Sequence, residues 1–569
     1  MMASAAIRCE KPGLLPATTP DTPESVAVQA RLVSALRDAA FLQEPGGGVT
    51  VLETHISYVL LTGQFAYKIK KAVNLGFLDY CTLSRRRFYC EEELRLNRRF
   101  APALYLDVVA ITGSVEAPTF GGEGPAIEYA VRMRAFRQDA LATRTLSRGQ
   151  LSAGHIDTLA AQVAAFHRAA DRTPPSPALG APHAVLRLAL QNFSQLRPLL
   201  DNQADLSDLE ALGDWTLEQH AACAPAMARR REQGCVRECH GDLHLGNIAV
   251  LEGQPLIFDC IEFNEEMRWI DVMSEIAFTV MDLTDRGRAD LANRFLNAYL
   301  EISGDYDGLS VLRFYLIYRA MVRAKVARLR AAQLALADAV PAWCTEYHGY
   351  VQLAKGYARP SRPAIIIAHG LAGSGKTTLS QALLETLGAV RIRTDIERKR
   401  LHGMRPTDRE HAGMDAGLYA SEATLATYLQ ALALARSATY AGYVTIVDGA
   451  FLKRWQRQFF RWLAAEHGIP FVIVAFVAKE ATLRERIARR LHEANDASDA
   501  DLAVLEHQLQ TQEPLAPEEL ADTVVYDAEA PLLEARSPTQ WGGVLDRLAR
   551  GHCTAVVASH RQPLQRPTT

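Results

Sequence analysis

The sequence has no large excess of either charge. Its 569 residues include 62 lysines and arginines and 65 aspartates and glutamates, which gives a net charge of −3. Such a balance produces no overall field that would attract nucleic acid or an anionic membrane surface. We therefore expect no nucleic-acid partner and no membrane partner, while protein partners stay unknown.

Long apolar runs are also missing. No uninterrupted apolar stretch approaches the roughly 18 residues that span a bilayer. The opening MMASAAIRCEKPGLLP has no continuous apolar segment of the secretory-signal type. The sequence therefore predicts a cytoplasmic protein. Apolar residues make up 49% and charged residues 22% of the chain, which is typical of globular proteins.

The nine cysteines lack the dense, regular spacing of a disulfide scaffold, so we expect reduced thiols. The sequence also has no C-x-x-C pair. A zinc site formed by Cys235, Cys239, His240 and Cys260 is therefore not favoured, and His240 already belongs to a different motif.

The chain is too long for one hydrophobic core, and its length predicts two to four domains. Residues 1–24 and 553–569 lack periodic apolar positions and are expected to be mobile tails. A proline-punctuated linker, 357–363, is expected to separate a first domain at 25–356 from a second domain at 364–552.

The first domain is expected to have two lobes. Residues 48–71 are rich in β-branched and aromatic residues and predict strands with a hairpin turn. Residues 83–100 predict a helix, and residues 126–133 predict a further strand. Together these elements form a small α+β lobe that ends at about residue 135, and an alanine- and leucine-rich, mostly helical lobe follows.

The second domain alternates buried apolar runs with helical segments. The runs AIIIA, TIVD and PFVIVAFV suit strands that are covered on both faces. Their alternation with helices predicts an α/β domain with a parallel sheet and right-handed crossovers.

The stretch CHGDLHLGN, residues 239–247, carries the first candidate site. His240, Asp242 and Asn247 have the spacing of the protein-kinase catalytic loop, in which the aspartate meets the attacking hydroxyl and the asparagine binds metal. The following IAVLEGQPLIFD predicts a hairpin that returns Asp259 toward Asn247. The alternative interpretation is that Asp242 and Asn247 only cap a loop.

With these motifs, roughly residues 30–355 resemble the aminoglycoside phosphotransferase family, whose members have a protein-kinase-like fold. The resemblance implies that Asp242 is the catalytic base and that Asn247 and Asp259 bind Mg2+. It implies an ATP-dependent reaction on an acceptor hydroxyl, and it does not identify the acceptor.

A kinase-like site also needs a lysine on the third strand, paired with a helix glutamate, to hold the phosphates of ATP. We assign Lys68 and Glu93 to this pair, and Lys70, on the same strand face, is the rival lysine. No G-x-G-x-x-G is present in this half; a turn at Thr54–Ser57 stands in its place, and its hydroxyls or amides would have to hold phosphate.

The second candidate site is the P-loop signature GLAGSGKT, residues 370–377, which lies between a predicted strand and a predicted helix. In such loops the backbone amides wrap a phosphate, the lysine reaches the β- and γ-oxygens, and the hydroxyl residue binds Mg2+. The expected ATP ligands here are Gly370, Gly373, Ser374, Gly375, Lys376, Thr377 and Thr378. Thr377 is also the expected metal ligand.

Two aspartates follow strands of the second domain. Asp448 ends the strand VTIVD and suits the magnesium-side carboxylate, and Asp395 follows RIRT at another strand end. Residues 362–550 resemble small-molecule P-loop kinases, near gluconate-kinase-like and zeta-toxin-like enzymes. That resemblance implies that Asp395 meets the acceptor hydroxyl and that Arg486 and Arg490 neutralise phosphate charge, although each arginine could instead belong to a solvated basic face.

The tandem order resembles bacterial bifunctional proteins with a phosphotransferase-like half before a P-loop ATP-binding half. The leading hypothesis is an ATP- and Mg2+-dependent kinase with two nucleotide sites, acting on hydroxyl-bearing small molecules. One alternative is a nucleotide-regulated binding protein in which one half, the first in preference, is not catalytic. Another is a toxin-like or macromolecule-directed kinase.

Overall fold

The structure is a computed structural model. It describes residues 24–38, 48–76, 78–172, 178–333, 340–405, 408, 421–493 and 501–550. The predicted tails, 1–24 and 553–569, lie outside the described residues apart from Glu24. The chain forms two compact units. The first unit runs through Leu141 and also includes His240–Asp242 and Leu256–Arg268, and the second holds the remainder.

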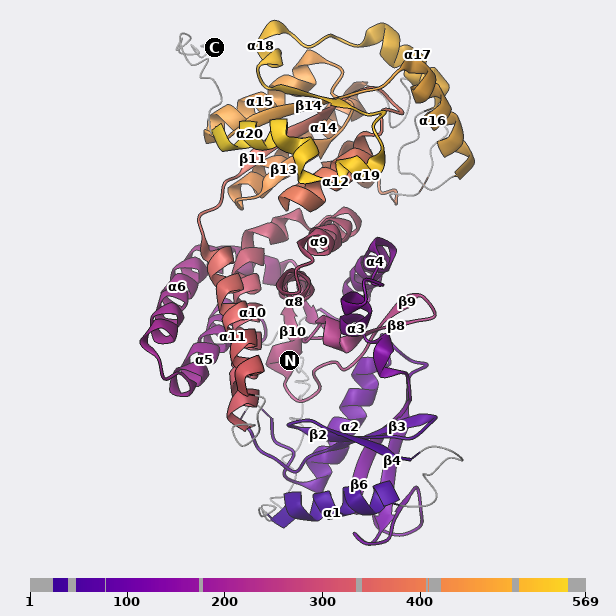
Figure 1. The fold of residues 1–569 in the computed structure, drawn as a ribbon, viewed down its shortest axis with the longest axis vertical. Coiled ribbons are helices and arrows are strands. Elements are labelled where there is room, and N and C mark those ends of the chain that lie inside the picture. Colours follow the sequence, from indigo (N-terminus) through magenta and orange to yellow (C-terminus); the bar gives the residue numbers. More distant parts are fainter. Residues whose placement is uncertain are drawn as a thin grey trace, which may run out of the picture. The chain divides into compact units, whose positions relative to one another are not determined.

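The first unit contains a six-stranded antiparallel sheet in the order β1-β2-β3-β6-β4-β5. Figure 1 labels strands β2, β3, β4 and β6 of this sheet. The predicted strands, hairpin and helix of the small lobe are confirmed. The elements are α1 (Glu24–Asp38), β1 (Thr50–Glu53), β2 (Ser57–Leu61), β3 (Phe65–Lys70), α2 (Leu83–Asn97), β4 (Tyr105–Gly113), β5 (Pro118–Phe120) and β6 (Glu128–Arg134).

Strand β3 sends alternate side chains to opposite faces of the sheet. Tyr67 and Ile69 lie in one apolar cluster with Leu36 of α1. Lys68 and Lys70 therefore point to the other face, where both contact α2. The period of two explains how two lysines come to share one glutamate partner.

The second unit begins with the helical lobe that the sequence predicted. Helices α8, α9 and α10 follow one another along the chain, and α8 packs against both of the others. The short strands β7 and β10 pair antiparallel. The helices are α3 (Ala142–Ser147), α4 (Ala153–Ala169), α5 (Pro182–Leu196), α6 (Gln203–Glu232), α8 (Val272–Asp285), α9 (Ala289–Ser303), α10 (Leu309–Gln333) and α11 (Val340–Ala358), and the two strands are β7 (Val236–Glu238) and β10 (Trp269–Asp271).

The predicted hairpin after the HGD motif is confirmed. Strands β8 (Ile248–Leu251) and β9 (Gln254–Ile257) form a two-stranded sheet. Glu252 and Gly253 connect them with φ values of 51° and 74°. Positive φ at both central residues is the requirement of a type I′ turn, which glycine meets at low cost.

The carboxyl-terminal part of the second unit is a five-stranded parallel sheet in the order β12-β13-β11-β14-β15. The predicted α/β fold class is confirmed, although β15 was not predicted. Its main elements are β11 (Ala364–His369), α12 (Lys376–Leu387), β12 (Val390–Arg393), α13 (Thr394–Leu401), α14 (Ser421–Tyr440), β13 (Val444–Asp448), α15 (Arg454–His467), β14 (Phe471–Val477), α16 (Glu480–Glu493), α17 (Leu502–Thr511), β15 (Thr523–Asp527), α19 (Leu532–Ala535) and α20 (Gly542–Arg550).

Among the described helices, none combines the length and the apolar character that a bilayer crossing requires.

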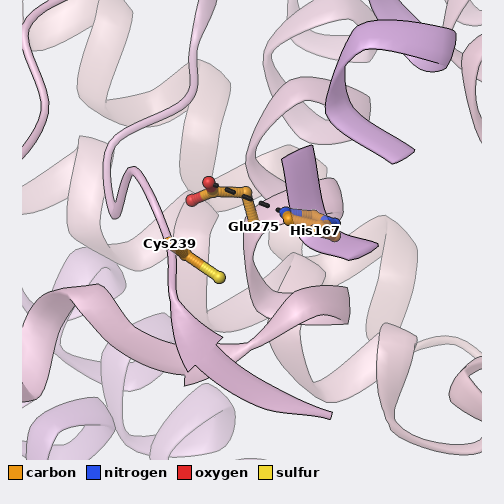
Figure 2. A group of neighbouring side chains, drawn as sticks. All are labelled: His167, Cys239 and Glu275. Carbon is orange, nitrogen blue, oxygen red and sulfur yellow. Dashed lines mark ion pairs between the residues drawn. The ribbon is translucent and has the colours of Figure 1, made fainter. Parts of the chain in front are cut away.

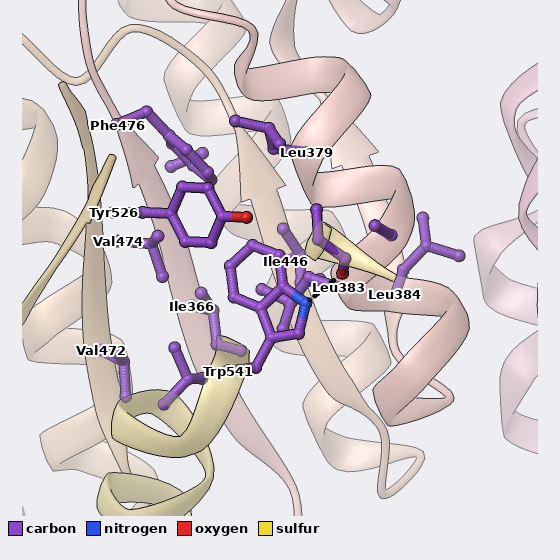
Figure 3. Close-up of a cluster of buried hydrophobic side chains, with 14 of the residues drawn as sticks. Ile366, Leu379, Leu383, Leu384, Ile446, Val472, Val474, Phe476, Tyr526 and Trp541 are labelled. Atoms are coloured by element: carbon purple, nitrogen blue, oxygen red, sulfur yellow. Dashed lines mark hydrogen bonds between the residues drawn. The ribbon is translucent and has the colours of Figure 1, made fainter. Parts of the chain in front are cut away.

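The core beside α12 is closed by aromatic side chains from the end of the chain (Figure 3). Trp541 is fully buried, stacks on Tyr526 at 4.6 Å between ring centroids, and donates its indole N–H to the carbonyl of Ala535 at 2.7 Å. Through these contacts Trp541 holds strand β15 and helix α19 against helix α12, which follows the P-loop.

We expect Trp541→Ala to lower the free energy of unfolding by about 3–5 kcal/mol, because it leaves a large cavity in a packed core. Urea unfolding followed by circular dichroism measures the change. Trp462→Ala is the matched control, since Trp462 is 61% exposed and should change stability little. Equal losses in the two variants would contradict this view of the core.

Candidate functional sites

In the first unit, Lys68 lies between two carboxylates. Its Nζ is 2.9 Å from Oε1 of Glu93 and 2.5 Å from Oδ1 of Asp259. Glu93 is completely buried on α2. Although burial opposes ionisation, the ammonium groups of Lys68 and Lys70 lower the pKa of Glu93 to about 2. The pair is therefore ionised at neutral pH. The structure brings together Lys68 and Glu93, the pair chosen from the sequence, and it also places Asp259 beside Lys68, a contact that the sequence did not predict.

The rival lysine is more enclosed. Lys70 is 1% exposed, and its Nζ contacts Oε2 of Glu93 at 2.7 Å and also Glu262. Glu262 accepts a further hydrogen bond from the Tyr80 hydroxyl, and the Lys70 ammonium lies 5.1 Å from the centroid of the Tyr80 ring. The partner of Lys68, in contrast, is the Asp259 carboxylate, whose side chain is 40% exposed. The geometry therefore supports Lys68 as the lysine available to a ligand.

The HGD motif owes its glycine to a close backbone approach. Gly241 has φ +90°, and a Cβ there would lie 2.8 Å from the carbonyl oxygen of Met267. His240 holds the turn from both ring nitrogens: Nε2 lies 2.8 Å from the Phe258 carbonyl, and the Asp242 amide donates to Nδ1 at 3.2 Å. A larger residue at 241, such as the arginine of protein kinases, would not fit this turn.

Asp259 adopts a backbone conformation that is uncommon for a non-glycine residue, with φ +67°. Hydrogen bonds hold it there: its amide donates to the Tyr105 hydroxyl at 3.2 Å, and the Cys260 amide donates to Oδ1 of Asn97 at 2.9 Å. A strained residue fixed by its neighbours is frequent at binding sites. Its partly exposed carboxylate is a suitable oxygen donor for Mg2+.

Asn247 ends a short 3-10 helix, Leu245–Asn247, in the second unit, and its side chain is buried. Asp242 and Asp259 belong to the first unit. The convergence of Asn247 with Asp259 on one metal ion therefore stays a prediction.

The turn that replaces a glycine-rich loop is occupied by its own hydrogen bonds. Oγ1 of Thr54 accepts from the amides of Ile56 at 3.3 Å and Ser57 at 2.9 Å, and it lies 2.8 Å from the Ser57 hydroxyl. From the sequence, the hydroxyls and amides of this turn are candidate donors to phosphate. Because they hydrogen-bond to one another, fewer of them remain available to a phosphate group.

In the second unit, the P-loop joins β11 to α12, as predicted. Gly373 has φ +80°, and a Cβ there would lie 2.7 Å from the carbonyl oxygen of Leu483. Gly370 and Gly375 also have positive φ values. The Nζ of Lys376 lies 2.8 Å from the carbonyl oxygens of Gly370 and Leu371, so the ammonium is held inside the loop. Ser374 is buried within the loop, Thr377 is partly exposed, and Thr378 is exposed.

Asp448 ends β13 at the carboxyl edge of the sheet, in register with Ala368 of β11 and Arg393 of β12. Its side chain is buried, and no hydrogen-bond partner for Oδ2 lies among the described residues. Nε of Arg393 is 3.9 Å from that oxygen. A buried carboxylate oxygen without a hydrogen bond fits a metal ligand. Asp395 lies in the first turn of α13 and is partly exposed.

The arginines of α16 have different surroundings. Nη2 of Arg486 donates to the Ala528 carbonyl at 2.8 Å, and its Nη1 would be 3.4 Å from a Cβ at Gly375, so this guanidinium lies at the P-loop. Arg484 instead pairs with Glu480 and Glu506 on the surface. The side chain of Arg490 lies outside the described residues.

Sequence reasoning missed a contact between the helical lobe and the P-loop helix. Arg391 of β12 is 4% exposed, and its Nη1 donates to the Thr377 carbonyl at 2.9 Å. Its Nε and Nη2 lie 2.9 and 2.7 Å from Oε1 of Glu301 on α9. No sequence signal marked either residue. Arg391 lies in the RIRT segment, which was considered only for Asp395, and Glu301 lies in an ordinary amphipathic helix.

A cavity of about 340 Å³ opens beside the same helix. Its walls include Thr377 and Thr378 of the P-loop helix and the guanidinium-bearing residues Arg294, Arg391 and Arg536. Arg294 also pairs with Asp157 and Glu385. The cavity therefore lies along one side of α12, and two of its three arginines, Arg294 and Arg391, already have carboxylate partners.

We expect Lys68→Met to weaken nucleotide binding and Lys70→Met to lower the stability of the fold. The Lys376→Ala background removes ATP binding at the P-loop, so that the ATP binding measured is that of the first site. In this background Lys68→Met should weaken Mg2+-ATP binding at least about tenfold, because charge-assisted contacts to phosphate are lost. Lys70→Met should instead lower the free energy of unfolding by about 3–5 kcal/mol, because it removes one partner of a buried ion pair. Titration with a fluorescent ATP analogue and urea unfolding make the two measurements. The reverse pattern would assign the phosphate lysine to position 70.

The Glu301–Arg391 pair should show energetic coupling. Glu301→Gln alone leaves a buried guanidinium without its carboxylate and should cost about 3–5 kcal/mol of unfolding free energy. Adding Arg391→Gln should recover part of that loss, so a double-mutant cycle should give a coupling energy of at least about 1 kcal/mol. Strictly additive losses would show that the two residues do not act together.

Comparisons with known proteins find two family matches at separate ranges of the chain. A model of the Phosphotransferase enzyme family matches residues 87–315, and a model described as AAA domain matches residues 365–515. Uncharacterized proteins of Mycobacterium tuberculosis and Mycobacterium bovis are 31% identical over 460 residues, which is 80% of this chain and 89% of theirs.

Solved structures similar to parts of the chain include three kinases. A choline/ethanolamine kinase family protein from Mesorhizobium loti is 12% identical, with 58% of this chain and 94% of that chain covered and a TM-score of 0.35. A gluconokinase from Sinorhizobium meliloti is 24% identical, with 34% and 96% covered and a TM-score of 0.24. A sugar kinase from Janibacter is 18% identical, with 34% and 98% covered and a TM-score of 0.24. The chain belongs to the same family as the mycobacterial proteins and joins a Phosphotransferase enzyme family domain to a P-loop AAA domain.

Proposed function

We propose that the protein is an ATP-dependent phosphotransferase with two nucleotide sites, each of which transfers a γ-phosphoryl group to a hydroxyl of a small molecule. The observation that carries the proposal is the presence of two separate lysine-centred sites. One is Lys68 between Glu93 and Asp259, and the other is Lys376 within a formed P-loop. The matched Phosphotransferase enzyme family supports the same reaction class.

At the first site, Lys68 is proposed to hold the phosphates of ATP, with Glu93 fixing its position. Asp259 and Asn247 are the proposed Mg2+ ligands; the ion neutralises phosphate charge when it is bound. Asp242 accepts the proton of the acceptor hydroxyl as its oxygen bonds to the γ-phosphorus. The bond from that phosphorus to the β–γ bridging oxygen breaks, and ADP leaves with the electron pair.

At the second site, the backbone amides of the P-loop and the Lys376 ammonium are proposed to hold the β- and γ-phosphates. Thr377 and Asp448 are the proposed Mg2+ ligands. The buried Oδ2 of Asp448 supports this role, because it has no hydrogen-bond partner within the described ranges. Asp395 is the proposed base for the acceptor hydroxyl. Arg486, whose guanidinium lies at the P-loop, is the residue proposed to stabilise charge on the transferred group.

One observation favours a second candidate function for the first half. The turn at Thr54–Ser57 uses its hydroxyls in its own hydrogen bonds, so the phosphates would have fewer donors than a glycine-rich loop offers. In this alternative the first half binds a nucleotide and changes its fit to a protein partner without transferring phosphate. A phosphorylated product that depends on Asp242 would exclude this alternative.

We expect Asp242→Asn and Lys376→Ala to remove different activities. Loss of a general base lowers the rate by about 10²–10⁴-fold, and loss of a group that stabilises transferred charge lowers it by about 10²–10³-fold. Metabolite extract incubated with ATP and Mg2+, followed by mass spectrometry, should show one set of phosphorylated products that vanishes in Asp242→Asn and another that vanishes in Lys376→Ala.

Lys479→Ala is the matched control in the P-loop domain, because its side chain is 82% exposed. It should retain both sets of products. If wild type and both site variants give the same products at the same rates, the two-site proposal is wrong.

A further inference from the structure

Within the described part of the chain, one group of three potential metal ligands lies outside both candidate sites. It consists of His167 on α4, Cys239 directly after β7, and Glu275 on α8. One ligand atom from each residue lies within 4.8 Å of the others, and Figure 2 shows the three side chains converging from separate elements. The exposed fractions are 4%, 0% and 1%, so the group is fully inside the protein.

The His167 ring is oriented by a neighbour on its far side. Its Nδ1 lies 3.0 Å from the hydroxyl of Tyr299, and the two rings meet edge to face. Burial raises the pKa of Tyr299, so this partner stays a neutral hydroxyl. When Nδ1 is the protonated nitrogen, Nε2 presents a lone pair to the cluster. Such an outer hydrogen bond is the usual way in which a metal-binding histidine is held.

The other ring nitrogen of His167 points into the group. No hydrogen-bond partner for Nε2 lies among the described residues, and Oε1 of Glu275 is 3.8 Å away. That distance is too long for a hydrogen bond. It is close to the separation of roughly 3.5 Å that two ligands of one tetrahedral Zn2+ adopt with bonds of about 2.0–2.3 Å.

The chemistry of the donors selects the class of ion. Imidazole nitrogen and thiolate sulfur favour borderline and soft transition metals over Mg2+ or Ca2+. A thiolate and a carboxylate together carry two negative charges, which a divalent ion balances in a buried place where uncompensated charge is costly. The Cys239 thiol also donates to the Ile270 carbonyl oxygen, at 3.6 Å.

We propose that His167, Cys239 and Glu275 bind one Zn2+ ion that has a structural role. The ion ties α4 and α8 to the chain at Cys239, the residue before the HGD motif, and the Cys239 thiol gives up its proton on binding. The sequence did not reveal this set, because its members follow no ligand-spacing motif. The zinc site considered from the sequence grouped Cys239 with Cys235, His240 and Cys260 instead. This proposal does not depend on the proposed phosphotransferase activity.

The test uses the full chain, stripped of metal and titrated with Zn2+ against a chromophoric chelator and with Co2+ by absorption. We expect about one equivalent of Zn2+ and a near-ultraviolet thiolate-to-cobalt band. Cys239→Ser and Glu275→Gln should weaken binding more than about 100-fold and remove or alter the band, and added chelator should lower the melting temperature of wild type only. Tyr299→Phe, which keeps all ligands, should weaken binding about 10- to 100-fold.

Cys223→Ser is the matched control, since Cys223 is also buried and its thiol donates to a backbone carbonyl, that of Ser310. It should bind Zn2+ as wild type does. Folded wild type that binds neither ion at micromolar concentration would overturn the proposal. So would binding that Cys239→Ser, Glu275→Gln and Tyr299→Phe all leave unchanged, because the ion would then lie elsewhere. If Cys239→Ser fails to fold, Tyr299→Phe and Glu275→Gln still decide the question.

Discussion

An ammonium group taken out of water needs oxygen partners, and this requirement shapes both candidate sites. Lys68 is nearly buried and is held by Glu93 and Asp259, whereas Lys376 is held by two carbonyl oxygens of its own loop. In each case the positive charge is positioned before any ligand arrives. A polyphosphate would then replace or join these partners without a large rearrangement, which lowers the cost of binding.

Within the second unit, helices α8 and α9 hold the segment after the HGD motif and the P-loop helix. Asp282 of α8 accepts from the Leu245 amide at 2.8 Å, and Thr279 donates to the Leu243 carbonyl, so the segment after Asp242 is anchored on a buried helix. One helix further along, Glu301 neutralises Arg391, which in turn binds the backbone of the P-loop helix. The helical lobe thus contacts both the segment that follows the HGD motif and, through Arg391, the P-loop helix.

Much of this arrangement could be predicted from the sequence because the signals were local. The buried runs such as AIIIA became parallel strands, and the EG turn became a hairpin, because period and turn chemistry decide those elements. The choice between Lys68 and Lys70 was beyond local reasoning, since both lie on one face and only the positions of Glu262 and Asp259 separate them. Likewise, Glu301, the partner of Arg391, and His167 and Glu275, the neighbours of Cys239, lie on helices that are distant in the sequence. No local sequence pattern predicts these contacts.

The central claim is that two pockets in this chain hold Mg2+-ATP independently, one through Lys68 and one through Lys376. Isothermal titration calorimetry with Mg2+ and a non-hydrolysable ATP analogue tests it most directly. The account predicts two binding equivalents for the intact protein, one for each single lysine variant, and none for the double variant. A stoichiometry of zero for the intact protein, or of two that neither substitution reduces, would contradict it.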